Sequence, residues 1–497
     1  MNNLYNNTLY GGIMSAVQIL DMNYVSLTFY CLLVISLLLY YILPHKFQVG
    51  VLLCTSIIYY VVAMPSMKHI LMFVTMILIN YIWGLVIEKA KGENAKKLRL
   101  LTVVGCICSA FPFAFMRLMD LLYGSILRRE RLSFIVPLGL AFFSMQMVAY
   151  LVDVSKGGKA EKNIFRHFLF MSFFPTIVQG PILRYEKMAK ELFLSHKIEI
   201  KNIIYGFRAI IWGFFLKYMI ADKAGVYVDH VFDNYLGYAG LYVLIAAVLY
   251  SVQLYTDFYS CVLICRGVAL LYGISLPQNF NHPYFSRSIG EFWSRWHISL
   301  SSWLRDYVYI PLGGNRKGRI RKYSNLMVTF LISGLWHGGS LNYIFWGLMH
   351  AVYQIVHDFT KNMGKMKDSS DEKIDIKIMK TLVTFFLVML GWIVFRAESL
   401  SIALHMIEAM FKVFNPWILF DGGIMSLGLD AKDWNVLLLS MLTLLYVEKA
   451  QFKNNYNLDK VSLPSRIVLY CVLIFVIAAF GTYGADYATQ NFIYGGF

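Results

Sequence analysis

Long apolar runs separated by short polar loops recur along almost the whole chain. A helix that crosses the roughly 30 Å hydrocarbon core of a bilayer needs about 20 mostly apolar residues. By this measure about 11 runs are predicted to be membrane spans, at residues 24–43, 48–63, 67–87, 98–115, 133–154, 203–220, 240–257, 260–276, 381–395, 434–447 and 466–480. Shorter apolar pieces are predicted to be re-entrant or interfacial helices, at 165–183, 325–336, 343–357 and 400–414. The pattern predicts an all-α, polytopic membrane protein.

The composition favours a membrane protein over a nucleic-acid-binding one. Of 497 residues, 58% are hydrophobic and 15% charged, and 45 Lys and Arg against 29 Asp and Glu give a formal net charge of +16. The hydrophobic share is above, and the charged share below, what is usual in soluble domains. The basic residues lie in short loops between apolar runs, as the positive-inside rule expects of cytosolic loops. We therefore expect the lipid bilayer as the surroundings and no nucleic-acid partner.

The same rule predicts an orientation in the cell membrane. The loop at 88–99 carries five Lys and Arg residues and is predicted to be cytosolic. Counting spans from this loop places the N-terminus and the C-terminus outside the cytosol. The loop at 117–131 breaks the rule, because it counts as external and yet carries four arginines. Either it is an amphipathic helix on the outer surface, or one span is miscounted.

Neither a metal nor a resident cofactor is expected. The seven cysteines all lie in apolar runs, without C-x-x-C spacing and without a histidine at zinc spacing. The glycine-rich signatures of serine hydrolases, NTPases and dinucleotide-binding folds are absent from the sequence. These classes of enzyme therefore have no support.

The stretch from Asn279 to His350 is dense in His, Arg, Asp, Ser and Trp for a chain this apolar. Ionisable residues at membrane depth are costly and tend to mark functional sites. The segment from Glu291 to Tyr307 is predicted to be one helix, with a polar face at spacings of three and four, formed by Ser294, His297, Ser301 and Arg305. His297 then lies either in a stripe that only satisfies neighbouring helices or in a functional site.

His337 is the leading candidate for a catalytic base. It lies between two apolar pieces, 325–336 and 343–357, that are each too short to cross a bilayer alone. Three glycines surround it, so a turn is predicted at membrane depth, where irregular backbone is tolerated only inside protein or around a watery cavity. An imidazole titrates near neutral pH and suits general-base chemistry.

Other polar residues allow a structural or a functional interpretation. Asp257 lies inside an apolar run and is expected to pair with Arg266 or with a histidine. The basic turn at 316–322 fits the positive-inside rule, and it also fits a mouth that attracts the phosphates of a cytosolic donor. His350 and His357 are expected to be structural or to line a polar surface.

Several long motifs stand out in and around this stretch: NFNHPY at 279–284, EFWSRWHISL at 291–300, WLRDYVYIPLGGNRKG at 303–318, SGLWHG at 333–338, FFP at 173–175, GPILRY at 180–185 and GWIVFRA at 391–397. They resemble motifs of the membrane-bound O-acyltransferase (MBOAT) family, most of all its bacterial alginate O-acetyltransferase branch. The resemblance covers most of the chain from about residue 135 onward. It implies a helical bundle around a tunnel, in which an acyl group passes from a cytosolic thioester to a hydroxyl outside the membrane.

The resemblance also implies roles for individual residues. His337 matches the essential histidine of the family, and His297 matches a second histidine in the signature segment. The donor, expected to be acetyl-CoA, and the substrate are expected to contact Arg305, Arg316, Lys317, Trp336 and Arg184. One departure concerns the residues after the YTDF run at 255–258, where relatives continue Ser-Gly-Tyr-Ser-Asp and this chain has YSCVL. The second acid of the family is therefore missing here.

The last six residues, FIYGGF, resemble the F-I-Y-x-x-F terminus of a small membrane subunit in teichoic acid D-alanylation. That resemblance implies that the terminus enters the acyltransferase and carries the acyl group on Tyr494. A phenol leaves far more readily than a sugar hydroxyl, so a tyrosyl ester keeps most of the transfer potential of the thioester. A frayed tail, common at chain ends, is the alternative.

These features predict a single acyltransferase domain over 1–497, with a core at 135–360, C-terminal helices at 380–480 and a tail at 481–497. The predicted function is O-acetylation of an extracytoplasmic cell-envelope polymer or exopolysaccharide, and the resemblance implies an SGNH-type acyltransferase or esterase as partner. D-alanyl transfer from a carrier protein to teichoic acid is an alternative among enzymes. A transporter or lipid flippase is an alternative of another class, although no inverted repeat is visible.

Overall fold

The computed structural model describes residues 21–64, 66–92, 94–127, 134–362, 373–452, 458, 461–483 and 492. Within these ranges all regular structure is helical and there is no β-strand, which confirms the predicted fold class. The α-helices are α2 (Leu27–Ile42), α3 (Gln48–Ala63), α4 (Met67–Lys89), α5 (Ala95–Asp120), α6 (Leu140–Ser155), α7 (Ile164–Ser172), α8 (Tyr185–Leu192), α9 (Ile200–Phe215), α10 (Asp222–Asp233), α11 (Leu241–Leu271), α12 (Ile289–Arg295), α13 (Ile298–Leu304), α14 (Gly318–His337), α15 (Leu341–Asn362), α16 (Ile374–Arg396), α17 (Leu400–Lys412), α18 (Ala431–Phe452) and α19 (Leu463–Phe480).

The part of the chain that the structure describes holds seven helices long and apolar enough to cross a membrane, at His45–Ala63, Met67–Lys89, Ala95–Ile126, Ile200–Asp233, Leu241–Leu271, Ile374–Arg396 and Leu463–Phe480. Two shorter apolar helices, α2 and α6, accompany them. The chain is therefore a multi-pass membrane protein, but the predicted number of 11 spans is not confirmed.

Part of the difference between the predicted and the observed number of spans lies in α11. The sequence predicts two spans there, at 240–257 and 260–276, whereas the structure has one helix of 31 residues. At about 1.5 Å per residue it is about 46 Å long, more than a bilayer core requires. Neither Gly nor Pro separates the two predicted spans, and the acid between them, Asp257, is paired inside the protein and needs no loop.

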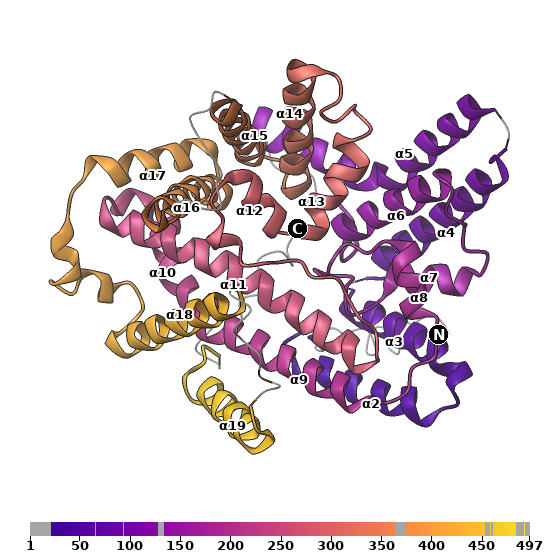
Figure 1. Cartoon of the computed structure of the whole chain (residues 1–497), viewed down its shortest axis with the longest axis horizontal. Helices are drawn as coiled ribbons and strands as arrows, with labels where there is room; N and C mark the ends of the chain where they lie inside the picture. The colour runs from indigo at the N-terminus through magenta and orange to yellow at the C-terminus, as the bar shows by residue number, and fades with distance from the viewer. Residues whose placement is uncertain are drawn as a thin grey trace, which may run out of the picture.

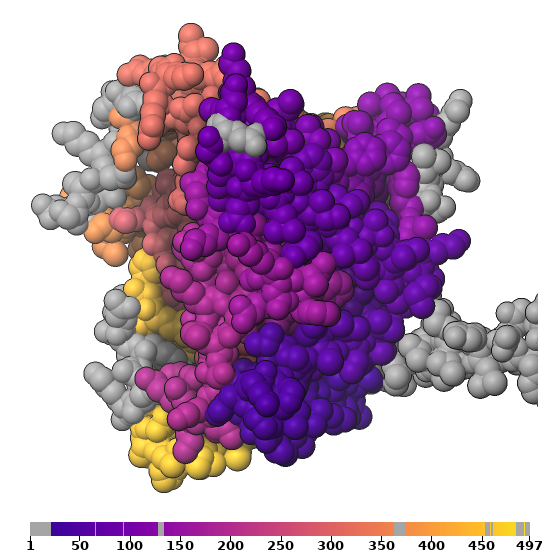
Figure 2. All heavy atoms as spheres, turned by 90° about the vertical axis from the view of Figure 1, so that its right-hand side faces the viewer, coloured from indigo at the N-terminus to yellow at the C-terminus, as the bar shows by residue number. Residues whose placement is uncertain are grey.

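Helix α11 runs through the middle of the molecule, with α2 to α8 on one side and α14 to α17 on the other (Figure 1). Figure 2 looks at the first of these sides and shows the N-terminal residues, in indigo and purple, covering much of that face. Helix α9 lies along α11 so closely that a Cβ at Gly267 would be 2.6 Å from the carbonyl oxygen of Gly206. Only glycine permits backbones to approach this far.

Helix α11 also joins the two largest apolar cores. Its first half, with Tyr250 and Leu254, packs in a core shared with α10, α12 and α16. Its second half, with Ile264 and Val268, packs in a core shared with α2 to α7. At the periphery, α19 has no buried residue at all, as expected of an apolar helix that faces lipid. The candidate catalytic residue His297 lies beside the middle of α11, where the Phe258 ring contacts it.

Candidate active site

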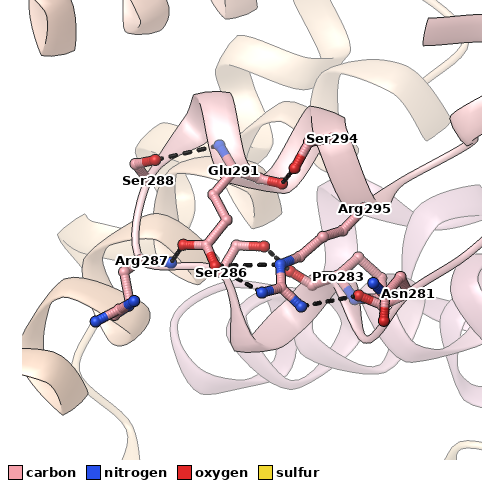
Figure 3. A network of polar contacts seen from close by, with 8 residues as sticks. All are labelled: Asn281, Pro283, Ser286, Arg287, Ser288, Glu291, Ser294 and Arg295. Carbon is pink, nitrogen blue, oxygen red and sulfur yellow. Dashed lines mark hydrogen bonds and ion pairs between the residues drawn. The ribbon is translucent and has the colours of Figure 1, made fainter. Parts of the chain in front are cut away.

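The segment before His297 is braced by a network around Glu291 (Figure 3). The Ser288 hydroxyl caps α12 by accepting the Glu291 N–H at 3.1 Å. The Glu291 carboxylate accepts the Arg287 N–H at 2.8 Å and lies 2.8 Å from the Arg295 guanidinium. Arg295 in turn donates to the carbonyl oxygen of Asn281 at 3.2 Å. These bonds fix both ends of α12 and hold it against the preceding loop.

The predicted single helix over 291–307 is wrong. The structure has two short helices, α12 and α13, and His297 between them has a left-handed backbone with φ of +43°. The break is stabilised by Asn279, whose carbonyl oxygen accepts the Ile298 N–H and whose side-chain oxygen accepts the Ser299 N–H, both at 2.9 Å. Because Asn279 accepts these first N–H groups, a separate helix, α13, begins here. The polar residues at 294, 297, 301 and 305 therefore do not share one helical face.

The predicted turn after His337 is present. His337 ends α14, and α15 begins at Leu341. A Cβ at Gly338 would lie 2.2 Å from the Tyr343 ring, and one at Gly339 would lie 2.4 Å from the Cβ of Asp120 on α5. The glycines are therefore needed because the turn packs against both neighbours. Helices α14 and α15 are longer than the predicted apolar pieces at 325–336 and 343–357. Each helix also includes polar residues at the end that is farther from His337.

His337 lies in an aromatic cage. Its ring centroid is 4.7 Å from that of Trp336, 5.0 Å from Trp346 and 5.1 Å from Phe395, all at steep angles. The residue is 2% exposed. A buried imidazole in such surroundings is held in one orientation and is kept away from bulk water.

His297 contacts the same tryptophan. Its ring centroid is 5.9 Å from Trp336 and 4.8 Å from Phe258 of α11. The residue is fully buried, and neither ring nitrogen has a hydrogen-bond partner on another residue of the described chain. Buried polar atoms almost always have a partner, so these nitrogens are open to a partner from outside the described residues. The indole N–H of Trp336 donates to the carbonyl oxygen of Ala141 at 3.2 Å, which fixes the ring that the two histidines share.

A cavity of about 520 Å³ lies near this pair, although neither histidine nor Trp336 is among its lining residues. Its inner lining includes Ile298, directly after His297, and Ser333, one turn before His337. Its outer lining includes Lys322 near the start of α14. The 11 positions from Lys322 to Ser333 correspond to about 16 Å of helix. The cavity therefore extends from a charged entrance to the residue after His297 and to the helical turn before His337.

Two of the predicted arginines are held by one acid that the sequence did not single out. Asp306 lies 2.9 Å from the Nε of Arg305 and 3.4 Å from an Nη of Arg184. The Arg184 guanidinium also stacks on the Tyr307 ring at 4.2 Å. Arg305 lines the cavity, whereas Arg184 does not.

The other predicted cations, Arg316 and Lys317, are exposed in the turn before α14 and are not among the lining residues. The cation at this part of the entrance is Lys322, whose ammonium lies 2.6 Å from an Asp358 oxygen. Tyr323 donates to the other oxygen of that carboxylate at 2.9 Å. The hydrogen bond from Lys322, aided by that from Tyr323, lowers the pKa of Asp358, so the carboxylate stays charged at the mouth.

The expected partners of Asp257 are wrong. Its carboxylate lies 2.8 Å from the ammonium of Lys217, which also lies 2.8 Å from Asp222. Arg266 instead donates to the carbonyl oxygen of Leu276. Lys217 precedes Asp257 by 40 positions and is on another helix, so local spacing gives no sign of the pair.

The remaining histidines differ in their surroundings. His350 is fully buried and accepts a hydrogen bond from the Trp293 indole at 3.3 Å, as expected of a structural residue. His357 lines the outer part of the cavity. Tyr494 lies outside the described residues.

The backbone at position 297 gives a test of the helix break. We expect His297→Asn to fold as the wild type does, because asparagine tolerates a left-handed conformation, and His297→Val to be less stable by about 1–2 kcal/mol. Thermal unfolding of the detergent-solubilised proteins measures the difference. Equal unfolding temperatures for the two variants would contradict the break.

Comparisons with known proteins identify the family of the chain. Residues 57–396 match the family described as MBOAT, membrane-bound O-acyltransferase. The probable alginate O-acetylase of Pseudomonas aeruginosa is 32% identical over 84% of this chain and 79% of its own length. The peptidoglycan O-acetyltransferase of Helicobacter pylori is 32% identical over 72% of this chain and 73% of its own. The teichoic acid D-alanyltransferase of Bacillus subtilis is 31% identical over 52% of this chain and 69% of its own. The chain belongs to the membrane-bound O-acyltransferase family.

Proposed function

We propose that this protein transfers an acetyl group from cytosolic acetyl-CoA to a polymer of the cell envelope or to an exopolysaccharide outside the membrane. The observation that carries the proposal is the cavity that begins among charged residues and whose lining reaches Ile298, next to His297, and Ser333, one turn from His337. The names of the relatives that align over most of this chain, an alginate O-acetylase and a peptidoglycan O-acetyltransferase, support acetyl as the group and an envelope polymer as the acceptor.

The donor binds with its phosphates at the mouth and its thioester at the inner end. Arg305 and Lys322 are the cations that line the cavity and face such phosphates. The inner lining is largely apolar, with Trp293, Leu326 and Phe330, and suits the long, uncharged arm that carries a thioester. An arm inserted this way brings the acetyl carbonyl to the level of Ser333, one turn from His337.

His337 acts as the general base. Its imidazole takes the proton of the acceptor hydroxyl while the hydroxyl oxygen forms a bond to the acetyl carbon. The carbon–sulfur bond then breaks, and the thiolate leaves with the proton that the imidazolium returns. His297 offers an N–H to the oxygen that becomes negative in this step. The aromatic cage excludes water, which would otherwise hydrolyse the thioester.

Tyr494 is the first acceptor in a two-stage relay. It would carry the acetyl group as a tyrosyl ester to the outer side, where an SGNH-type partner transfers it to the polymer. The described residue nearest to it in the tail is Phe492, which is 5% exposed within the protein, and this burial supports a tail that enters the protein. In this proposal both termini lie outside the cytosol, so Tyr494 would meet the donor from the outer side. In a one-step variant the polymer hydroxyl itself enters and uses the same base.

D-alanyl transfer is the alternative within the family. The relative with that name aligns over about half of this chain, against about four fifths for the alginate O-acetylase, so acetyl transfer is favoured. The mass of the acyl group found on the protein distinguishes acetyl transfer from D-alanyl transfer.

Replacing the base or the carrier should abolish acetylation. We expect His337→Asn and Tyr494→Phe each to lower polymer acetylation in cells by about 100-fold or more, since general-base catalysis contributes about 10²–10⁴-fold. The exposed residues His405 and Tyr446 provide matched controls, His405→Asn and Tyr446→Phe, which should retain activity. Intact-protein mass spectrometry after addition of acetyl-CoA should show one acetyl group on the wild type and none on Tyr494→Phe. Normal acetylation by both test variants at normal expression would contradict the proposal.

The position of the donor has its own test. We expect Lys322→Met to raise the KM for acetyl-CoA by about 5- to 30-fold, which corresponds to about 1–2 kcal/mol for one charged contact, with little change in kcat. Arg316→Met removes an equally basic side chain that does not line the cavity and should leave KM unchanged. A raised KM for Arg316→Met together with an unchanged KM for Lys322→Met would place the phosphates at the basic turn before α14 and not at the cavity mouth.

A further inference from the structure

Lys217 is buried, and yet no step of the proposed chemistry uses it. It lies in η3 (Leu216–Ala221), a π-helical segment between α9 and α10. Its side chain is 2% exposed, and its ammonium lies 2.8 Å from carboxylate oxygens of Asp222 and Asp257. Desolvation of three charges usually offsets what their attraction contributes, so such a cluster is weak evidence for a role in stability alone.

The same ammonium contacts the C-terminal tail. It lies 4.6 Å from the centroid of the Phe492 ring, within the range of a cation–π interaction. The Phe492 carbonyl oxygen accepts a hydrogen bond from Gln179, a fully buried side chain, at 3.5 Å. Phe492 is thus held at its ring and at its backbone, by residues more than 270 positions away in the sequence.

The beginning of the tail meets the same segment. The Thr482 N–H donates to the carbonyl oxygen of Tyr218, next to Lys217, at 3.1 Å. The Tyr483 ring lies 5.6 Å from the Tyr218 ring. The chain therefore leaves α19 at η3 and is again in contact with η3 at Phe492.

This attachment lies close to the histidine pair. Asp257, which holds Lys217, is followed in α11 by Phe258, whose ring contacts His297 at 4.8 Å. Gln179 lies three positions before Ile182, whose N–H donates to the Ser299 hydroxyl at the start of α13. Both contacts of Phe492 are thus connected to the segment that carries His297.

We propose that Lys217, oriented by Asp222 and Asp257, forms with Gln179 a docking site for the chain's own tail, in which the Phe492 ring binds over the ammonium. Lys217 is then a positioning residue, and the inference rests on the proposed carrier role of Tyr494. Two residues of chain span at most about 7 Å. Anchoring Phe492 therefore confines Tyr494 to a small region, and an acceptor must be held within about 3–3.5 Å of the carbon that it attacks.

Fluorination of the ring tests the contact without disturbing the ion cluster. Removal of Lys217 would leave two buried acids and could unfold the protein, whereas mono-, di- and trifluorophenylalanine at position 492 keep the shape of the ring and weaken its attraction for a cation. The series is made in the full-length protein in detergent. The same series at Phe475, an exposed residue of α19, is the matched control.

Docking is measured by carboxypeptidase digestion followed by intact-protein mass spectrometry. We expect the rate of trimming past residue 492 to rise stepwise with fluorine number, by about 2- to 30-fold in all, as the loss of a cation–π contact of about 0.5–2 kcal/mol requires. The control series should be flat. A flat response at position 492 overturns the docking site, whatever the activity.

The rate at which Tyr494 gains an acetyl group from acetyl-CoA is measured on the same samples. If the docking site positions the tyrosine, this rate falls in the same order in which trimming rises. In another outcome, trimming responds to fluorination while Tyr494 gains no acetyl group, even in the protein with unsubstituted Phe492. That result would refute the carrier role and the positioning role, and it would leave the docking contact intact. Acetylation that stays constant while trimming responds would refute the positioning role alone.

Discussion

Both candidate catalytic histidines lie where a helix is broken, and a break in an apolar environment is possible only if the freed backbone groups find partners. At His297 the partner is Asn279, which accepts the first two N–H groups of α13. At His337 the chain can turn because glycines 338 and 339 let it pack against α15 and α5. If either break were absent, the two imidazoles would not both contact the ring of Trp336.

The surroundings of the site follow from this placement. The rings of Trp336, Trp346, Phe395 and Phe258 contact the two imidazoles, while the charged residues that line the cavity lie at its mouth, about 16 Å away along α14. There Asp306 and Asp358 orient the cations. A donor with charged phosphates and an uncharged arm fits this separation of charge from apolar lining.

The sequence predicted those features that depend on local pattern. The all-helical class followed from the apolar runs, and the turn at His337 followed from its glycines and the short pieces beside it. The single helix over 291–307 failed because the residue that breaks it, Asn279, lies outside the amphipathic window. The prediction of two spans in place of α11 failed because of Asp257. An acid in an apolar run indicates a polar environment, but the sequence does not show whether water or a residue such as Lys217 provides it. Asp306 and the Phe492 contact of Lys217 were missed for the same reason, since each depends on contacts between distant segments. Lys322 was part of the predicted basic turn at 316–322, but the sequence did not distinguish it from Arg316 and Lys317.

In the proposed function the cavity between Lys322 and Ser333 delivers the acyl donor toward the two histidines. A cryo-EM structure of the protein with a non-transferable thioether analogue of acetyl-CoA would show where the donor binds. We expect the phosphates beside Arg305 and Lys322, and the carbonyl of the analogue between Ser333 and the rings of His337 and His297. Density for the analogue at any other site, with this cavity unoccupied at saturating concentration, would contradict it.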